Sequence, residues 1–239
     1  MLSSLLSGGD IRTALISILL TIPTVLIALS FHEAAHGYAA YKMGDRTAYN
    51  LGRVTFNPLK HLDPIGTIFM LVFGYGWATP VPINTRNFKN PKKGMALSAL
   101  AGPLTNLVLG ALGVLLSVLT IFVANTQSVR TAMYNNEMVY NIVQISYTFF
   151  YYFGYLNLLY TVFNMIPIPP FDGSRVISLF LPTKTYFKIM QYERYSLVAV
   201  LILSFLCSRL FNFSPFSWLA GELYDLISLP FYSLFNLIF

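Results

Sequence analysis

The stretch IALSFHEAAHGYAAYKMGD, residues 27–45, decides the fold, because it continues an apolar run that occupies residues 11–30. Roughly 20 predominantly apolar residues are enough to cross the hydrocarbon core of a bilayer, so this run predicts a membrane-spanning helix. His32, Glu33 and His36 fall where the stretch should be most apolar. Ionisable side chains inside a membrane are costly and usually mark function. These three residues are therefore the first candidates for a functional site.

The composition also indicates a membrane protein. Of the 239 residues, 56% are hydrophobic and 10% are charged, whereas a soluble domain has about 25% charged residues. The formal net charge of +6 is also found in nucleic-acid-binding proteins. Here, however, the basic residues lie in loops between apolar runs, where they fit membrane orientation and anionic headgroups better. The single cysteine, Cys207, excludes a disulfide framework and a cysteine-based zinc site within one chain.

We predict an all-α integral membrane helical bundle of about five spans. The first helix should pass the histidines and end at Gly44, because glycine readily adopts the left-handed conformation that closes a helix. The fifth segment contains Glu222 and Asp225 and is expected to insert only in part. Residues 1–176 should form a three-span core, and residues 177–239 the C-terminal membrane segments. The later spans are expected at Gly94–Ala124, Ile142–Ile168, Tyr195–Leu210 and Trp218–Phe239.

Basic residues in the loops predict the orientation of the bundle. Loops rich in lysine and arginine stay on the cytoplasmic side of a membrane. One such loop follows the first span and another follows the third, whereas the loop after the second span offers Arg130 against Glu137. The N-terminus is therefore expected outside, and the segments after the first and third spans meet at the cytoplasmic leaflet. The basic residues are Lys42, Arg46, Arg53, Lys60, Arg86, Lys89, Lys92 and Lys93 in the first loop, and Arg175, Lys184, Lys188 and Arg194 in the later one.

The HEAAH sequence predicts a zinc site. His32 and His36 are four residues apart, so on a helix both imidazoles lie on one face and can reach a single ion. Glu33 projects beside the metal, where it can take a proton from a water molecule that zinc acidifies. A catalytic zinc needs a third protein ligand, and the candidates are carboxylates or His61. The alternative, a helix without metal, would leave three unpaired ionisable groups in an apolar environment.

A second motif, FNMIPIPPFDGSRV, occupies residues 163–176 at the end of the third span. Its prolines remove backbone donors and break regular helix. An aspartate followed by glycine at such a break can turn its carboxylate inward. Because the loop charges place this segment in the same leaflet as His32, Asp172 is the predicted third zinc ligand.

The two motifs together carry a family resemblance. HEAAH on a membrane span, followed by N-x-x-P-x-x-x-x-D-G on a later one, resembles the site-2 protease family of intramembrane zinc metalloproteases. The resemblance covers residues 11–176. It implies one zinc ion per chain, held by His32, His36 and Asp172, with Glu33 as the general base. It also implies a helical substrate that is unwound and cut within the membrane.

Two asparagines match positions of the same family. Asn164 corresponds to the family asparagine that hydrogen-bonds the scissile carbonyl or the substrate backbone, so the resemblance implies a catalytic role for it. AGPLTN resembles the family's second-span motif and implies that Asn106 lies near the site, where it would contact substrate. An interhelical hydrogen bond is the alternative role for Asn106. Many relatives carry PDZ or CBS domains, for which this chain has no room, so a compact branch of the family is expected.

The loop between the two motifs contains a short glycine-rich segment, IGTIFMLVFGYGWATPVP, residues 65–82. It is too short for a confident span, and we predict a small β-hairpin or re-entrant loop that turns at Gly74 and Gly76. A strand edge near the zinc could pair with an unwound substrate, which makes both glycines candidate substrate-binding residues. The alternative is a loop that only packs. For His61, in NPLKHLDP, a structural role is expected rather than one at the metal.

The predicted function is zinc-dependent hydrolysis of peptide bonds within a bacterial or archaeal cell membrane. The expected partners are single-span or signal-peptide-like membrane proteins and the lipid bilayer, without nucleic acid, and a homo-oligomer is left open. One alternative is a membrane zincin of another class, against which the D-G segment argues. Another is a non-catalytic metal-binding scaffold, which should have lost Glu33. A metal transporter should show further ionisable residues along a path, and the first three spans offer few.

Overall fold

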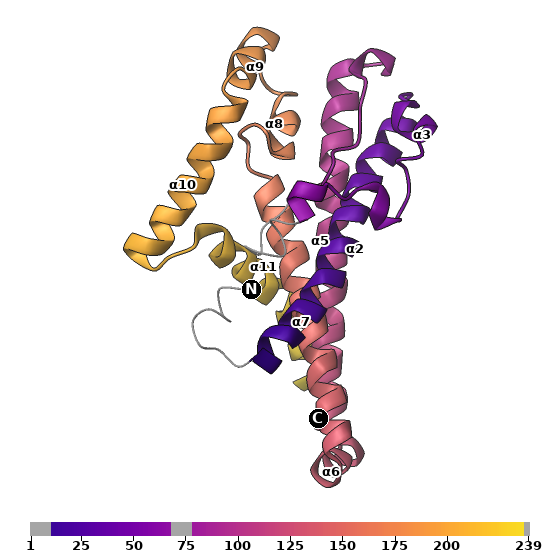
Figure 1. Cartoon of the computed structure of the whole chain (residues 1–239), viewed down its shortest axis with the longest axis vertical. Coiled ribbons are helices and arrows are strands. Elements are labelled where there is room, and N and C mark those ends of the chain that lie inside the picture. Colours follow the sequence, from indigo (N-terminus) through magenta and orange to yellow (C-terminus); the bar gives the residue numbers. More distant parts are fainter. Residues whose placement is uncertain (1–10, 68–77, 237–239) are drawn as a thin grey trace.

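A computed structural model describes residues 11–67 and 78–236 of the chain, and within these ranges it is helical without a sheet (Figure 1). The predicted all-α class is therefore confirmed. The α-helices are α2 (Ile11–Lys42), α3 (Thr47–Asn50), α5 (Pro91–Asn125), α6 (Gln127–Asn135), α7 (Glu137–Asn164), α8 (Asp172–Ile177), α9 (Thr183–Met190), α10 (Glu193–Phe211) and α11 (Pro215–Asn236), with short 3₁₀ helices η1 (Pro58–Lys60) and η2 (Thr85–Asn87).

Within the described ranges, three helical segments are long and apolar enough to cross a membrane. They are Ile18–Lys42 of α2, Pro91–Asn125 of α5 and Glu193–Phe211 of α10. Helices α7 and α11 also have sufficient length, but α7 is rich in tyrosine and asparagine, and α11 contains two acidic residues. These residues lower the hydropathy of both helices. The predicted count of about five spans is thus not confirmed.

Helix α2 passes through the histidine-containing stretch without interruption and ends at Lys42, as predicted. It also accommodates Pro23 within its length. Gly44, just beyond its end, has a φ of +111°, a backbone conformation that glycine adopts without the steric penalty of a side chain. The chain therefore leaves the helix at the predicted position, and His32 and His36 stay on a regular helical surface.

Helix α5 is the central element of the bundle and contacts α2, α7, α8 and α11. Small residues allow its closest approach to α7. A Cβ atom added to Gly113 would lie 2.4 Å from the backbone nitrogen of Gly154, and one added to Gly110 would lie 2.6 Å from Leu158. Small residues at such interfaces let helix backbones pack closely where apolar lipid offers no hydrophobic driving force.

The apolar core lies beyond this close contact, toward the C-terminal end of α5. Val114 and Val118 of α5 pack there with Leu158 of α7 and Tyr224 of α11. The hydroxyl groups of Ser117 and Tyr224 lie 2.6 Å apart and form a buried hydrogen bond. This cluster joins the three helices on the part of α5 that does not contact the histidines.

The segment after α2 is held by one buried carboxylate, Asp45. Its oxygens accept hydrogen bonds from the backbone N–H of Thr47 (3.0 Å), the backbone N–H of Asn84 (2.7 Å) and the side-chain amide of Asn87 (2.8 Å). Burial raises the pKa of Asp45, but these hydrogen bonds and one from the Thr47 hydroxyl outweigh it, so the pKa lies below its ordinary value of 3.8. Asp45 thus ties η2 to the end of α2.

The predicted hairpin falls largely on residues 68–77, so Gly74 and Gly76 lie outside the described residues. The described flanks of this segment are close together, because Leu62 and Ala78 form an isolated antiparallel β-bridge. The backbone N–H of Thr79 also donates to the carbonyl of His61 at 2.7 Å. The hairpin itself remains a prediction.

Helix α10 stands apart from the bundle formed by α2, α5 and α7 (Figure 1). None of the residues in its candidate span is buried, and its surface includes exposed Leu203 and Phe205. A hydrogen bond from the Ser196 hydroxyl to the carbonyl of Pro169 joins its first turns to the segment before α8. An isolated apolar helix of this kind is stable in lipid rather than in water.

Candidate metal centre

The three predicted ligands lie together in the folded chain. Nε2 of His36 lies 2.9 Å from Nε2 of His32, and Oδ2 of Asp172 lies 3.2 Å from each of these nitrogens. All three side chains are buried. Among the described residues, this is the one group of three histidine, cysteine or acidic side chains whose ligand atoms lie within 4.8 Å of one another.

Helix α5 presents three residues, spaced by four, to the two histidines. The main-chain carbonyl of Ser98 lies 2.7 Å from Nδ1 of His36, and Oδ1 of Asn106 contacts Nδ1 of His32. Gly102 lies between them. Residues four apart share one face of a helix, so a single stripe of α5 contacts both imidazoles of α2.

Hydrogen bonds to the Nδ1 atoms determine which ring nitrogens face each other. A main-chain carbonyl can only accept, so His36 must donate from Nδ1 to Ser98. The Asn106 oxygen likewise accepts from His32, because the Asn106 nitrogen is used elsewhere as a donor. When the rings are neutral, both Nε2 atoms then present lone pairs toward each other and toward the Asp172 carboxylate. A cation between them would relieve this repulsion.

The donor set fits zinc. Two imidazole nitrogens and one carboxylate are a ligand combination that catalytic zinc sites use. In such sites each ligating histidine also donates its other ring nitrogen to an acceptor, as His32 and His36 do here. The residues present therefore fit a zinc ion on the chemistry of their donors and on the hydrogen bonds behind them.

Gly102 provides the space for the imidazoles. A Cβ atom at this position would lie 2.5 Å from both Cε1 and Nε2 of His36, and 2.7 Å from Cε1 of His32. Real Cβ atoms do not approach other atoms this closely. Any side chain at Gly102 would consequently displace the atoms that face Asp172.

The motif at residues 163–176 places Asp172 by a close backbone contact. Asp172 is the first residue of α8. A Cβ atom at the next residue, Gly173, would lie 2.3 Å from the carbonyl oxygen of Met165. The first turn of α8 can therefore rest directly on the end of α7 because residue 173 has no side chain. This contact turns the Asp172 carboxylate toward α2.

Glu33 lies next to the histidines in sequence and holds a different segment. Its Oε2 accepts a hydrogen bond of 2.8 Å from the backbone N–H of Val81. Arg53 donates to the carbonyl of Thr79 at 2.6 Å. Together, Glu33 and Arg53 fix the extended stretch at residues 79–81 beside α2.

This stretch has few free donors for an added strand. Within residues 79–82, the N–H of Thr79 donates to His61 and that of Val81 donates to Glu33. Pro80 and Pro82 have no N–H. A substrate strand that pairs with this chain would thus need backbone donors outside residues 79–82. The predicted pairing at Gly74 and Gly76 stays a prediction.

The remaining sequence candidates lie as follows. The side-chain amide of Asn164 donates to the carbonyl of Tyr160 on its own helix, so its predicted contact with substrate stays a prediction. Nε2 of His61 lies 2.8 Å from the carbonyl of Thr55, and His61 does not belong to the His32 cluster. Asn106 makes interhelical hydrogen bonds, the role given above as the alternative to substrate contact. Its partners are His32 and Ala28 of α2 and Asn157 of α7.

Three contributors to the site escaped the analysis of the sequence. The carbonyl of Ser98 has no sequence signal, because every residue has one. Gly102 belongs to AGPLTN, but its role beside the imidazoles depends on how α5 packs against α2. Asn157, which hydrogen-bonds Asn106, does have a signal: it is a polar residue within the apolar sequence YLNLLY.

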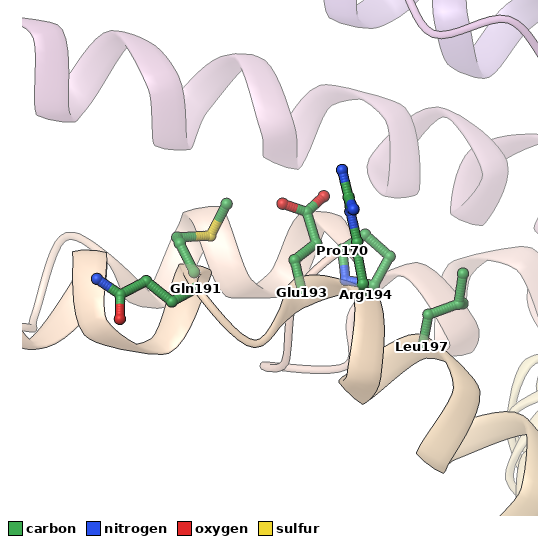
Figure 2. Close-up of a pocket in the computed structure, with 6 residues that line it drawn as sticks. Pro170, Gln191, Glu193, Arg194 and Leu197 are labelled. Atoms are coloured by element: carbon green, nitrogen blue, oxygen red, sulfur yellow. The ribbon is translucent and has the colours of Figure 1, made fainter.

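A pocket of about 420 Å³ lies beside the broken segment that precedes Asp172. Figure 2 shows Glu193 and Arg194 at the start of α10 extending toward the same side. Pro170 belongs to the proline-rich motif at residues 163–176, which breaks the helix before Asp172. The full lining is Pro170, Met190, Gln191, Glu193, Arg194 and Leu197.

Comparisons with known proteins agree with this geometry. The sequence profile of Peptidase family M50 matches residues 20–207. YwhC of Bacillus subtilis, whose name provisionally describes a zinc metalloprotease, is 41% identical over 180 residues, which cover 75% of this chain and 77% of YwhC.

Two more distant relatives carry the same provisional description. Rip2 of Mycobacterium tuberculosis is 25% identical over 210 residues, covering 85% of this chain and 71% of Rip2. MJ0611 of Methanocaldococcus jannaschii is 28% identical over 148 residues, covering 62% of this chain and 63% of MJ0611. No solved structure matches the chain.

Proposed function

Because this chain belongs to Peptidase family M50, we propose that it is a zinc metalloprotease that hydrolyses peptide bonds of substrates embedded in a membrane. The observation that carries the proposal is the buried cluster of His32, His36 and Asp172, with both Nδ1 atoms already hydrogen-bonded. The histidines lie on α2 and contact α5, and both helices are apolar enough to cross a membrane, which supports a location within the bilayer.

His32, His36 and Asp172 are the residues that would hold the ion. Zinc at this position would supply Lewis acidity, which polarises a carbonyl group and acidifies water. The protein's contribution is to orient the ligands: α5 holds the two imidazoles, and the contact of Gly173 with the end of α7 holds the carboxylate.

Glu33 is the proposed general base. It follows His32 directly, and the hydrogen bond from the Val81 N–H restrains its carboxylate. From this position it would take a proton from the attacking water and pass it to the leaving amine of the cleaved peptide bond. Asn164 is proposed to contact the substrate after its amide leaves the carbonyl of Tyr160.

The proposed substrates are single-span or signal-peptide-like membrane proteins. A helical substrate must unwind before cleavage, because a peptide bond within a regular helix is shielded by its own hydrogen bonds. Water would reach the site from the cytoplasmic side. The pocket beside Pro170, which Glu193 and Arg194 also line, is a candidate route, since Pro170 lies two residues before Asp172. A homo-oligomer is compatible with the exposed apolar surface of α10.

The decisive experiment compares wild type with Glu33→Gln. The full chain is purified in detergent, loaded with zinc and incubated with a panel of single-span membrane proteins. Glu33→Gln should bind zinc like wild type and cleave no substrate, because an amide keeps the shape of the side chain but does not accept the proton. Glu222→Gln is the matched control, since Glu222 is an exposed acidic residue of α11, and it should cleave normally.

Two outcomes would contradict the proposal. Cleavage by Glu33→Gln at a rate near that of wild type would show that another group is the base. A wild-type chain that binds zinc but cleaves none of the panel would favour a non-catalytic scaffold. Asp172→Ala tests the ligand set separately, and zinc content equal to that of wild type would remove Asp172 from the site.

A further inference from the structure

We propose that Asn157 of α7 is a positioning residue for the metal centre. It would hold the side chain of Asn106 in the one orientation that lets Asn106 accept from Nδ1 of His32. The inference rests on the proposed function, in which His32 is a zinc ligand. It extends the site by one residue, from a helix that contributes no zinc ligand.

A continuous chain of hydrogen bonds connects α7 to His32. The Asn157 amide nitrogen donates to the carbonyl of Phe153 at 2.8 Å. The Asn157 oxygen accepts from the amide nitrogen of Asn106 at 2.9 Å, and this nitrogen also donates to the carbonyl of Ala28 at 3.2 Å. The Asn106 oxygen contacts Nδ1 of His32. Asn106 and Asn157 are both completely buried.

The direction of the chain follows from its fixed ends. The carbonyl of Phe153 can only accept, so Asn157 must turn its NH₂ group toward it and its oxygen toward α5. Asn106 must then present its NH₂ group to Asn157 and Ala28, and its oxygen to His32. His32 therefore donates from Nδ1, and its Nε2 keeps a lone pair for the metal.

The two histidines are oriented by different means. His36 donates to a main-chain carbonyl, that of Ser98, which cannot rotate while α5 stays intact. His32 donates to the side chain of Asn106, which can rotate by 180° and exchange its oxygen for its nitrogen. A reversed Asn106 would offer a donor to Nδ1 of His32 and favour the tautomer with hydrogen on Nε2, which cannot ligate. Asn157 prevents this reversal.

The loss of Asn157 should reduce the affinity for zinc. Substitution of a group that orients a metal ligand typically costs 10–100-fold in metal affinity. Because Ala28 still favours the correct orientation of Asn106, we expect the lower end of this range, about 10-fold.

The test measures zinc affinity by competition with a chelator on the full chain in detergent. Asn157→Leu removes both hydrogen bonds and keeps four side-chain heavy atoms with the same branching, and it should weaken zinc binding about 10-fold. The same variant loaded with Co²⁺ should show an altered visible absorption spectrum, because that spectrum reports ligand geometry. Asn157→Ala provides a second variant if the leucine does not fit, with the same expected result.

Thr161→Val is the matched control. Thr161 lies one turn after Asn157 on the same helix and is buried. Its hydroxyl lies 3.2 Å from the carbonyl of Pro103 on α5 and 3.0 Å from the main-chain carbonyl of Asn157, and it can donate to either. The substitution also removes a buried polar contact between α7 and α5, but not one that belongs to the chain to His32. Its zinc affinity and Co²⁺ spectrum should match those of wild type.

A double-mutant cycle separates positioning from general damage to the bundle. In Asn106→Asp, both carboxylate oxygens accept, so rotation of the side chain no longer changes what His32 encounters. In this background the Asn157 oxygen faces a second acceptor instead of an NH₂ group. Asn157→Leu should therefore not weaken zinc binding in the Asn106→Asp background, although it weakens binding about 10-fold in the wild-type background.

The outcomes distinguish this inference from the proposed function. Wild-type zinc affinity in both Asn157→Leu and Asn157→Ala would overturn the role of Asn157. The same holds if Asn157→Leu lowers zinc affinity equally in the wild-type and the Asn106→Asp backgrounds. The proposed site would remain intact in either case, provided that His36→Ala abolishes zinc binding. Retention of zinc by His36→Ala would instead overturn the proposed site itself.

Discussion

The two halves of α5 have similar requirements for small residues but use them differently. In the N-terminal half, Gly102 leaves room for the imidazoles of α2 between two groups that accept hydrogen bonds from them. In the C-terminal half, Gly113 leaves room for the backbone of α7 at Gly154, next to an apolar core. The first contact positions candidate ligands, and the second packs two helices.

The difference shows how one rigid helix can serve chemistry and stability at once. A metal site needs its ligands held with little freedom, and residues on packed helices provide this better than loops do. Substitutions in the N-terminal half should therefore affect metal binding most, while those in the C-terminal half should affect folding most. Gly102→Ala and Gly113→Ala test this division, and Asp45→Asn, outside α5, gives a smaller effect for comparison.

The largest effect is expected for Gly102→Ala. The added methyl group would overlap the His36 ring, at 2.5 Å from Nε2, and the ring must move away from Asp172. We expect zinc affinity to fall by about 100-fold or more, the upper end of the range for groups around a ligand. Chelator competition on the purified chain measures this change.

Gly221→Ala is the control for Gly102→Ala. Gly221 lies in α11, and a Cβ atom there would meet nothing within 4 Å. Alanine is the better helix former by about 1 kcal/mol, so this variant should be at least as stable as wild type and should bind zinc normally. Zinc binding by Gly102→Ala at the level of Gly221→Ala would remove the distinction between the two halves of α5.

Gly113→Ala should have the second-largest effect, and on stability rather than on zinc. Its methyl group would lie 2.4 Å from the backbone nitrogen of Gly154, and a helix backbone cannot move aside as a side chain can. Overpacking of this kind costs about 1–3 kcal/mol. Unfolding of the metal-free chain in detergent measures the loss. If Gly113→Ala has wild-type stability but impaired zinc binding, the C-terminal half of α5 serves metal binding and not folding.

The smallest effect concerns Asp45, a buried carboxylate near the end of α2 that does not belong to the metal cluster. Its pKa is lower in the folded chain than its ordinary value of 3.8, because its hydrogen bonds outweigh the effect of burial. The ionised form therefore stabilises the fold above pH 3.8, and this contribution is lost as the pH falls through the lower, folded-state pKa.

Acid unfolding of the metal-free chain tests this expectation. Asp45→Asn should be less stable than wild type near neutral pH and should lose less stability as the pH falls below 3.8. Its zinc affinity at neutral pH should stay close to that of wild type. If the stability of the two proteins falls equally with pH, Asp45 does not contribute to the pH dependence of folding.

Several elements of the fold could be predicted from local patterns alone. The apolar run at residues 11–30 and Gly44 predict the course and the end of α2, because both depend on neighbouring residues. The fifth predicted span and the tyrosine-rich α7 are not among the three candidate membrane spans of the described residues, since their polar residues lower the hydropathy. The hairpin at Gly74 and Gly76 lies outside the described residues.

By itself, the sequence determined the candidate ligands: the spacing of His32 and His36 follows from the helical repeat, and the D-G motif identifies Asp172. Only the tertiary structure decided what holds them. The register between α2 and α5 selects the Ser98 carbonyl and Gly102, and the packing of α7 brings Asn157 to Asn106. Main-chain carbonyls and empty spaces have no residue-specific signature, so they become visible only when helices distant in sequence pack together.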